Sequence, residues 1–402
     1  MAGAGPGGLA SALYLSRAGH RVRLFERFAR PQPVGSGLML QPTGLAVLAD
    51  LGLGERTFAL GARIDRLSGT DARTGRVVLD VGYWPLGRHV HAVGMHRATL
   101  FNLLHEPVGE ARLPMRTAYA VSAVERDTSR IWLRSPNGLE GPFDLVVDAM
   151  GAGSPLRAEA PGTHRQRSLA FGAIWGTVPW VDEGFSRHAL SQRYVRAKVM
   201  IGVLPLGRRT RGGVEEAAFF WSLKPEELSA LQQGGFEAFS TEVHRHWPAT
   251  APHLAALGGF EALTLARYAH QTLARPVGDR IVFVGDSAHS TSPQLGQGAN
   301  MALLDAAALS AALASTDDLA DALGTYARLR RWHVRLYQLL SLTLTPFYQS
   351  DGALLPLLRD GLIAVAAQWG PVQKLLAEMV AGQLLRPLES LGLRPVGTRP
   401  GT

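Results

Sequence analysis

A segment between residues 281 and 309 constrains the fold of this chain most strongly. It begins with a short apolar run typical of a buried strand, which leads directly into Gly285 and Asp286. Gly296 and Gly298 then precede an Ala- and Leu-rich stretch that predicts a helix. In open α/β sheets, ligands bind outside the carboxyl ends of the strands, where Asp286 would stand. We therefore expect Asp286 to accept a hydrogen bond from a ligand hydroxyl, and the first amides of the helix to face an electron-rich or anionic group.

A second glycine motif stands at the beginning of the sequence. Gly3, Gly5 and Gly8 form the pattern Gly-x-Gly-x-x-Gly ahead of a helix predicted over 9–18. In a dinucleotide-binding turn the first glycine permits the tight turn, the second lets the backbone approach a pyrophosphate, and the third lets the helix pack closely. Glu26 ends a predicted strand, where a carboxylate can bind the ribose hydroxyls of an adenosine. The spacing favours a nucleotide-binding turn over a purely structural one.

The strand that should precede this turn is almost absent from the sequence. A Rossmann unit needs a buried strand before its first glycine, and only Met1 and Ala2 stand there. Two explanations are open: residues that precede Met1 are missing, or the central strand is truncated. We favour the first.

The segment from Gly285 onward resembles a signature of a known family, the group A flavoprotein monooxygenases, which are similar to para-hydroxybenzoate hydroxylase. The family pattern runs Gly-Asp-Ala-Ala-His, three residues, Pro, two residues, Gly-Gln-Gly, one residue, Asn, and an Asp-Ala further on. The sequence matches it at Gly285, Asp286, Ala288, His289, Pro293, Gly296, Gln297, Gly298, Asn300, Asp305 and Ala306. It departs from the pattern at Ser287, where the family has Ala.

The resemblance implies a single-component, FAD-dependent monooxygenase with a Rossmann-like α/β fold. FAD would be reduced by NADPH or NADH and react with O2, and the resulting C4a-hydroperoxide would hydroxylate an aromatic small molecule. Arg97 also matches the family, which places an Arg near the FAD chain with Leu three residues later. The cofactor-binding residues expected are Gly3, Gly5, Gly8, Glu26, Arg97, Asp286, Pro293, Gly296, Gln297, Gly298 and Asn300. The sequence names no catalytic residue, and we expect no metal.

The family's third signature, Gly-Ala-Asp-Gly-x-x-Ser-x-x-Arg, is altered in this chain. The matching positions are Gly151, Ser154 and Arg157. Met150 replaces the acid of the motif, and Gly153 stands where the family usually has an Arg-type residue. Asp148, two residues before Met150, would compensate only in part. Because the family motif is associated with binding of FAD and NAD(P)H, direct reduction by NAD(P)H is the open step.

Hydrophobic periodicity supports a discontinuous α/β FAD-binding domain, an antiparallel sheet and a C-terminal helical region. The resemblance implies that the antiparallel sheet forms the substrate domain. The expected boundaries are 1–60, 94–165 and 270–315 for the FAD-binding domain, 61–93 and 166–269 for the substrate domain, and 316–402 for the helical cap. Within the first domain, a three-strand excursion is predicted over 119–125, 131–134 and 143–147. In the second, the sequence predicts a hairpin around Thr74-Gly75, strands over 171–178, 191–203 and 217–223, and an amphipathic helix over 226–247.

Several aromatic residues are candidates for a substrate pocket. Phe219, Phe220 and Trp221 must alternate between the faces of their strand, so that either Phe220 or the other two can line it. Tyr194, Tyr268 and His270 are further candidates, and packing in the core is the alternative for each of these residues.

The predicted helical tail is broken by Pro346, Pro356 and Pro371. It is strongly apolar in its later part, which includes Leu354, Leu355, Leu357, Leu358 and Trp369. A cap over the FAD-binding domain, a lid over a substrate tunnel and a peripheral membrane contact are all compatible with this pattern. Such a tail also resembles family members that act on quinolones, polyketide aromatics or prenylated quinone precursors. Apolar or bulky aromatic substrates are therefore favoured over small benzoates.

Composition excludes several other classes of protein. The chain has a formal charge of +8, but its basic residues are scattered and interleaved with acids, which does not indicate a nucleic-acid interface. It has no Cys, so disulfides and thiolate metal sites are excluded. No stretch reaches the roughly 18 uncharged apolar residues of a membrane span, and the sequence opens without a secretory signal pattern. We expect a bacterial cytoplasmic protein.

Two other functions remain open on the same fold. One is an FAD-dependent reductase of prenyl-type double bonds, which would not need oxygen. The other is a flavin-binding protein without turnover, which the altered third signature and the short first strand would favour. A flavin halogenase is excluded, because the chain lacks the Trp-x-Trp-x-x-Ile-type motif of that class.

Overall fold

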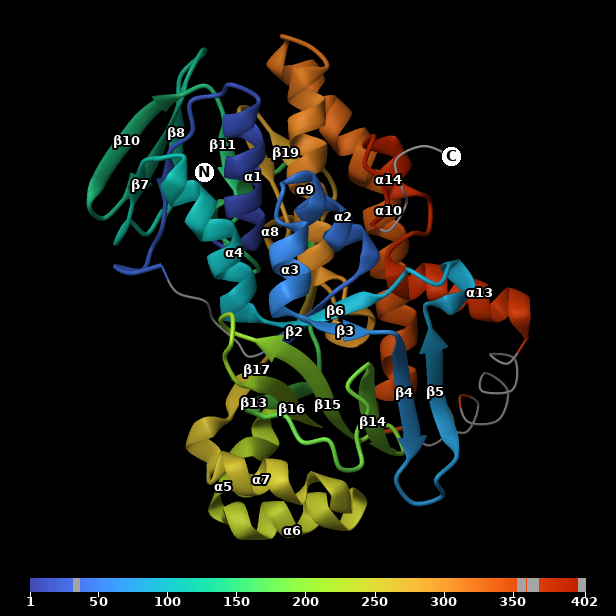
Figure 1. Ribbon diagram of the computed structural model, residues 1–402. Coiled ribbons are helices and arrows are strands. Elements are labelled where there is room, and N and C mark those ends of the chain that lie inside the picture. The colour runs from blue at the N-terminus through green and yellow to red at the C-terminus, as the bar shows by residue number, and fades with distance from the viewer. Residues whose placement is uncertain (32–36, 353–358, 360–368, 397–402) are drawn as a thin grey trace.

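The computed structural model describes residues 1–31, 37–352, 359 and 369–396. An α/β unit carries both glycine motifs, and a large sheet with its own helices lies beneath it (Figure 1). The antiparallel-sheet domain and the α/β domain that the sequence predicts are both present.

A parallel sheet forms the centre of the α/β unit. Its strands are β7 (Met115–Arg116), β1 (Leu24–Phe25), residue Ala2, β11 (Val146–Asp148), β20 (Ile281–Phe283) and the antiparallel β19 (Val277–Gly278). Ala2 forms parallel bridges to Phe25 on one side and Asp148 on the other, so it occupies the position of the central strand. The amino group of Met1 donates to Arg23 O at 2.8 Å, and burial lowers its pKa to about 5.

Three helices cover one face of this sheet, and they are α1 (Pro6–Arg17), α4 (Arg97–Glu110) and α9 (Gly298–Ala314). The two glycine motifs meet on α9. A Cβ at Gly7 would lie 3.3 Å from the Cβ of Ala302, and one at Gly285 would lie 2.9 Å from it. Small residues at these three positions therefore allow α1, α9 and the end of β20 to pack closely.

Shorter elements complete the α/β unit. The three-strand excursion is an antiparallel sheet of β8 (Ala123–Arg126), β9 (Ile131–Ser135) and β10 (Gly138–Phe143). The strand predicted over 143–147 was wrong, because β10 ends at Phe143 and a separate strand, β11, begins at Val146. A second small sheet contains β2 (Gly37–Leu40), β6 (Ala92–His96) and β3 (Ala62–Ile64), next to α2 (Pro42–Asp50) and α3 (Gly54–Leu60).

The large sheet has seven strands in the order β17-β13-β16-β15-β14-β4-β5. Their bounds are β17 (Thr264–Ala266), β13 (Gly172–Pro179), β16 (Glu215–Leu223), β15 (Val199–Arg208), β14 (Ala189–Val195), β4 (Arg66–Asp71) and β5 (Val77–Gly82). Neighbouring strands are antiparallel except for the pair β14 and β4. A two-stranded ladder of β12 (His164–Ser168) and β18 (Ala269–Leu273) connects this sheet to the α/β unit.

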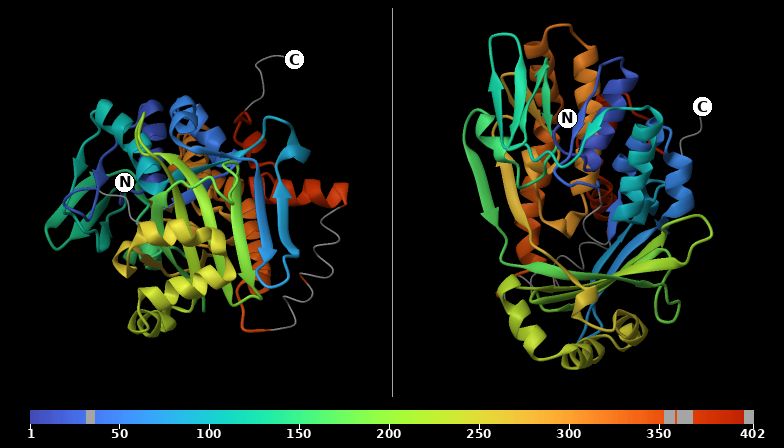
Figure 2. Two further views of the ribbon diagram at one scale, coloured as in Figure 1. Left: turned by 60° about the horizontal axis from the view of Figure 1, so that its bottom comes forward. Right: turned by 90° about the vertical axis from the view of Figure 1, so that its left-hand side faces the viewer.

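The two faces of the large sheet pack differently. Phe219 and Trp221 point to the face covered by α6 (Phe236–His246) and α7 (Ala251–Leu257), where they belong to a buried core with Phe239 and Leu254. Phe220 points to the opposite face, toward the α/β unit. Figure 2 shows the sheet lying between the α/β unit and these helices. The predicted alternation of the three aromatic residues is confirmed.

Two predicted elements of this domain were wrong in extent. The strand expected over 191–203 is a hairpin, because the chain reverses between β14 and β15 at Arg196, which has a φ of 55°. The helix expected over 226–247 is divided into α5 (Leu228–Gln233) and α6, because Gly235 takes a φ of 86° between them.

The C-terminal part contributes α10 (Leu319–Tyr348), α13 (Gly370–Ala381) and α14 (Pro387–Ser390). Pro346 lies inside α10, two residues before its end, so the predicted break falls later than expected. Pro371 occupies the first turn of α13, where its missing amide hydrogen is not needed. Pro356 and the run Leu354 to Leu358 lie outside the described residues. Within the described part of the chain, no helix combines the length and apolar character needed to cross a membrane.

Replacing His253 by leucine is expected to stabilise the protein. His253 is completely buried beside the edge of Phe185, and neither ring nitrogen has a hydrogen-bond partner among the described residues. Removing the unsatisfied nitrogens should raise the free energy of unfolding by about 1 kcal/mol in chemical denaturation at pH 7.5.

The same variant should change the pH dependence of stability. Burial lowers the pKa of His253 to about 4, so below pH 6.5 the unfolded chain takes up a proton that the folded chain resists. Stability is then lost as the pH falls from 6.5 toward 4, and His253→Leu should lose less over this window. Equal pH profiles of both proteins would show that His253 is solvated or paired.

Candidate active site

The N-terminal glycine turn has the geometry expected of a phosphate cradle. Gly3 takes a φ of 96°, and a Cβ there would lie 2.6 Å from Ala149 O. A Cβ at Gly8 would lie 2.1 Å from Gly3 O, so this position must also be glycine. A Cβ at Gly5 would meet nothing within 4 Å, which leaves open space in front of the helix N-terminus. The first amides of α1 can therefore approach an anionic group.

Glu26 lies beside this turn and is held by backbone amides. Its Oε2 accepts from Ala4 N and its Oε1 from Phe28 N, both at 3.0 Å. The two amides fix the carboxylate at the end of β1, next to the glycine turn. Since each carboxylate oxygen has a second lone pair, Glu26 can still accept from ligand hydroxyls.

Asp286 begins the short helix α8 (Asp286–His289) directly after β20. Gly285 takes a φ of 61°, which turns the chain so that Asp286 is exposed to a cavity. A Cβ at Gly298 would lie 3.9 Å from Asp286 Oδ1, so the carboxylate faces the start of α9. The surrounding protein displaces water and raises the pKa of Asp286, although His289 and Arg97 act in the opposite direction.

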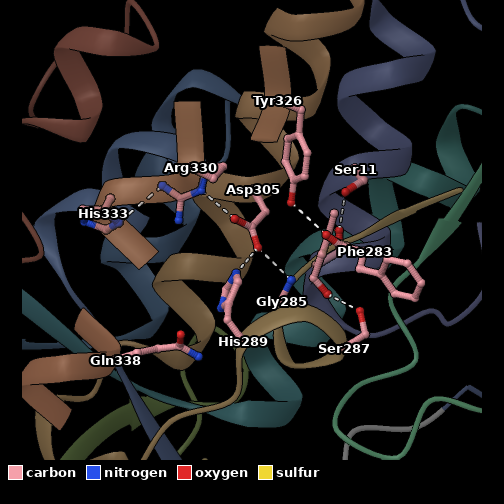
Figure 3. A network of polar contacts seen from close by, with 12 residues as sticks. Ser11, Phe283, Gly285, Ser287, His289, Asp305, Tyr326, Arg330, His333 and Gln338 are labelled. Carbon is pink, nitrogen blue, oxygen red and sulfur yellow. Dashed lines mark hydrogen bonds and ion pairs between the residues drawn. The ribbon is translucent and has the colours of Figure 1, made fainter. Parts of the chain in front are cut away.

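A buried polar network around Gly285, the residue before Asp286, fixes this turn (Figure 3). Asp305 of α9 accepts from Gly285 N at 2.7 Å, contacts His289 Nε2 at 2.6 Å and accepts from Arg330 Nε at 2.6 Å. His333 contacts Arg330 through Nδ1 at 3.3 Å and Gly382 O through Nε2 at 2.9 Å. The network therefore ties the turn that presents Asp286 to α9, α10 and the residue after α13.

Burial and neighbouring charges shift the pKa values of the groups in this network. Burial opposes ionisation of Asp305, but His289 and Arg330 outweigh this effect and lower its pKa to about 2. Burial and the neighbouring Arg330 lower the pKa of His333 to about 3, so its imidazole is neutral at physiological pH. The pair of Asp305 and Arg330 is thus a buried ion pair with additional hydrogen bonds.

The side chains of two predicted cofactor-binding residues form hydrogen bonds within the protein. Asn300 is fully buried and accepts from Gln41 N at 2.8 Å, while it donates to Met39 O and Gly296 O. Gln297 donates to Val380 O at 2.6 Å. Neither side chain lines the cavity, so each holds the loop whose backbone faces it. Pro293, Gly296 and Gly298 do line the cavity.

Arg97 enters the same cavity from another element. It is exposed in the first turn of α4 and lines the cavity together with Asp286, where its charge acts against the burial that raises the pKa of Asp286. His96 caps this helix by accepting from Ala98 N at 3.1 Å, and its other ring nitrogen lies 3.3 Å from Thr177 Oγ1. The cap holds the first turn of α4 against the large sheet.

The altered third motif is a buried hydrogen-bonded turn. Asp148 is fully buried, accepts from Met150 N at 2.9 Å and accepts from the hydroxyl of Ser154. Burial raises the pKa of Asp148 to about 6, against the effect of these hydrogen bonds. Arg157 donates to Ala152 O. Asp148 therefore stabilises the turn through these two hydrogen bonds. It does not take the place of the acid that Met150 replaces.

The cavity that Asp286 faces has a volume of about 630 Å³. It extends from Asp286, Arg97 and Pro293 along the face of the large sheet that carries Phe220. Its walls are mainly apolar and aromatic, and they include Leu38, Val81, Trp84, Trp175, Leu190, Tyr194, Met200, Leu204, Phe220 and Tyr268. Tyr194 and Tyr268 are thus confirmed as pocket residues, whereas His270 does not line the cavity.

A large part of this lining was not predicted from the sequence. The strand β5 contributes Val77 to Val81, α10 contributes Leu344, Phe347 and Tyr348, and α13 contributes Gln373, Leu376, Met379 and Val380. These segments come together only in the folded chain, and none carries a motif. The β-branched and apolar content of β5 was the sole available signal.

The residues present fit FAD as the ligand of this site. A cradle of backbone amides at Gly5, a fixed carboxylate at Glu26 and an accessible carboxylate at Asp286 suit a pyrophosphate, a ribose and a ribityl chain in turn. The fold and this site define a flavin-dependent oxidoreductase.

The chain belongs to the family described as FAD binding domain, whose model matches residues 1–336. The FAD-dependent urate hydroxylase of Klebsiella pneumoniae is 26% identical over 339 residues, which cover 83% of this chain and 85% of that protein. The aurachin C monooxygenase/isomerase of Stigmatella aurantiaca is 27% identical over 341 residues, which cover 82% and 84%. The predicted family and cofactor are thereby confirmed.

Solved structures show the same fold. Klebsiella pneumoniae HpxO, whose structure contains FAD and uric acid, has a TM-score of 0.80 at 20% identity and covers 95% of this chain and 96% of its own. A mutant of 2-methyl-3-hydroxypyridine-5-carboxylic acid oxygenase has a TM-score of 0.77 at 20% identity and covers 96% of each chain.

Proposed function

We propose that this protein is a single-component FAD-dependent monooxygenase that hydroxylates an apolar or bulky aromatic small molecule. The observation that carries the proposal is the continuity of the site. One cavity contains Asp286 and Pro293 at the expected flavin end, and it continues into a chamber lined by Trp175, Phe220 and Leu204. Such a chamber suits a planar, poorly hydrated substrate of more than one ring.

In this proposal the cofactor supplies the redox chemistry, and the protein supplies binding and position. When bound and reduced, FAD activates O2 so that one oxygen atom enters the substrate and the other leaves as water. The backbone at Gly5 and the carboxylates of Glu26 and Asp286 would hold FAD. The apolar walls of the chamber would exclude water and orient the ring of the substrate.

Tyr268 is the candidate for orienting a polar group of the substrate. Its hydroxyl accepts from Trp175 Nε1 at 2.9 Å, which leaves its own hydrogen free to point toward a ligand. Burial raises the pKa of Tyr268, so the phenol is neutral and donates. A phenolate or carbonyl oxygen on the substrate would be its acceptor. Tyr268→Phe is the variant that probes this role.

NADPH or NADH is the proposed electron donor. The third signature, which the family associates with NAD(P)H binding, lacks its acid here, and the buried Asp148 does not replace it. Anaerobic mixing of the FAD-loaded protein with NADPH or NADH tests the donor. Bleaching of the flavin absorbance supports direct reduction, and an unchanged spectrum with both would indicate a separate reductase.

The function is tested by oxygen uptake. FAD-loaded protein is incubated with a reductant and a panel of bicyclic quinolones, naphthols, small benzoates and a prenylated quinone, and the products are identified by mass spectrometry. The proposal expects one product for a member of the bulky group. If the protein consumes no oxygen but saturates a prenyl double bond, it is a reductase. If it is reduced and reoxidised without any product, it is a flavin-binding protein without turnover.

Filling the chamber should impair large substrates selectively. Leu190 lines the cavity on β14, and Leu190→Trp would occupy part of its width. We expect kcat/KM for the best bulky substrate to fall about tenfold or more, because overpacking of this size costs on the order of 1–3 kcal/mol. The conservative variant Leu190→Met should stay within about threefold of the wild type. Equal losses in both variants, with FAD retained in each, would show that the chamber does not bind the substrate.

A further inference from the structure

Large apolar side chains on the outer face of α10 are exposed to solvent. Trp332 is 62% exposed, Leu339 is 56% exposed and Leu342 is 44% exposed. They are seven and three residues apart along the helix, so they share one side of it. The opposite side of α10 is buried, where Tyr326, Arg330 and Tyr337 pack against the protein. The exposed stripe is therefore not part of the core.

The same face is positively charged. Arg328, Arg331 and Arg335 are exposed, and the guanidinium groups of Arg331 and Arg335 lie 5.0 and 5.6 Å from the ring centre of Trp332. No Asp or Glu occurs between Asp321 and Asp351. We call the six residues Arg328, Arg331, Trp332, Arg335, Leu339 and Leu342 the α10 outer face.

We propose that the α10 outer face docks on an anionic phospholipid bilayer. Trp and Leu side chains bury their apolar atoms at the boundary between headgroups and acyl chains, while Arg side chains extend to the lipid phosphates. Each basic group near an anionic bilayer strengthens binding, and the effect depends on salt because it is electrostatic. The α10 outer face supplies both kinds of contact on one helix.

A second copy of the chain fits this surface less well. A twofold interface places the same surface on both sides, so three Arg side chains would face three others. The face has no acid of its own to compensate. Glu378 of α13 lies near α10, but it does so beside Tyr337, on the buried side of the helix. The positive charge of the α10 outer face therefore favours an anionic partner, and its exposed Trp and Leu side chains favour an apolar one.

The position of this face relates it to the cavity. Further along α10, Leu344, Phe347 and Tyr348 line the cavity. The same helix therefore carries the α10 outer face and borders the cavity. Docking through α10 would bring the chamber close to the membrane, where an apolar aromatic compound is concentrated. The docking itself does not depend on the proposed oxygenase activity, and it can be measured without turnover.

Co-sedimentation with vesicles tests the inference on the full-length, FAD-loaded protein. Vesicles of phosphatidylcholine alone are compared with vesicles in which about a third of the lipid is phosphatidylglycerol. We expect at least about tenfold tighter binding to the anionic vesicles, and a clear loss of that binding at high salt. Absence of binding to the anionic vesicles would overturn the proposal.

Two variants separate the contributions. Trp332→Ser/Leu339→Ser/Leu342→Ser removes the apolar contacts, and Arg328→Gln/Arg331→Gln/Arg335→Gln removes the charges. Each should weaken vesicle binding about tenfold or more and leave FAD content unchanged. The matched control Arg88→Gln/Arg211→Gln/Arg275→Gln removes three exposed charges elsewhere and should bind as the wild type does. Wild-type binding by either α10 variant would overturn the proposal. So would a wild-type dimer that the Trp332 variant converts to a monomer, because the face would then be an interface between copies.

Discussion

Replacing Asp286 by alanine is expected to give a folded protein that does not retain FAD through purification. The carboxylate is exposed to the cavity at the end of β20 and faces the start of α9, where the ribityl chain is expected. Hydrogen bonds to a charged group contribute about 1.5–3 kcal/mol, so the affinity for FAD should fall roughly 10- to 100-fold. The flavin absorbance of the purified protein and a fluorescence titration with FAD measure this change.

Two further variants make the result specific. Asp286→Asn keeps one acceptor oxygen and should bind FAD with intermediate affinity. Asp279→Ala removes an exposed carboxylate from the turn between β19 and β20, only seven residues away, and should retain FAD fully. If Asp286→Ala is as yellow as the wild type, the second glycine motif does not hold the flavin, and the assignment of this end of the cavity fails.

The second large effect is expected from Arg330→Met, which should destabilise the protein by about 3–5 kcal/mol. The substitution leaves the fully buried Asp305 without its guanidinium partner and opens one side of the network around Gly285. The free energy of unfolding from denaturant titration measures the loss. Because Gly285 presents Asp286, the affinity for FAD should fall as well, which a purely remote packing defect would not cause.

The double variant Asp305→Asn/Arg330→Met provides the control. It removes both charges while the amide oxygen of Asn can still accept from Gly285 N, so the double variant should be less destabilised than the sum of the single variants. Losses that simply add would mean that Asp305 and Arg330 do not interact.

The network also predicts how the free energy of unfolding depends on pH in the acidic range. The folded pKa of Asp305 lies near 2, below the ordinary value of about 3.8, so its stabilising effect is complete above pH 4 and is lost as the pH falls toward 2. The profile of Arg330→Met should be flatter in this window, because the ion pair is already absent. Unchanged curvature between pH 4 and 2 would contradict the low pKa.

Local motifs predicted the cofactor end of the site because each one is a short contiguous segment with a steric requirement. Gly3, Gly8 and Gly285 lie where a Cβ would collide with the backbone or with Ala302, so the glycines themselves carry the information. The internal hydrogen bonds of Gln297 and Asn300 were not predictable, because a motif fixes which residue is present and not which way its side chain points. The boundaries of the domains and the roles of the cofactor-binding residues stay predictions.

The substrate end of the site could not be predicted in detail. The turn at Arg196 that makes a hairpin of residues 189–208 contains no Gly, Pro or Asn, so nothing in the sequence marked it. The chamber is closed by β5, α10 and α13, which are far apart in the chain and meet through tertiary packing. The pairing of Arg330 with Asp305 could not be predicted, because the two residues lie 25 positions apart and no motif links them; Arg330 is 2% exposed.

The most direct test of the proposed monooxygenase function follows the oxygen atoms. The FAD-loaded protein is supplied with a reductant, its best aromatic substrate and O2 enriched in heavy oxygen, and the product is analysed by mass spectrometry. We predict that the product contains one labelled oxygen atom from O2, and that Asp286→Ala forms no product. A product whose new oxygen comes from water, or turnover that proceeds equally without O2, would contradict the assignment of this protein as a monooxygenase.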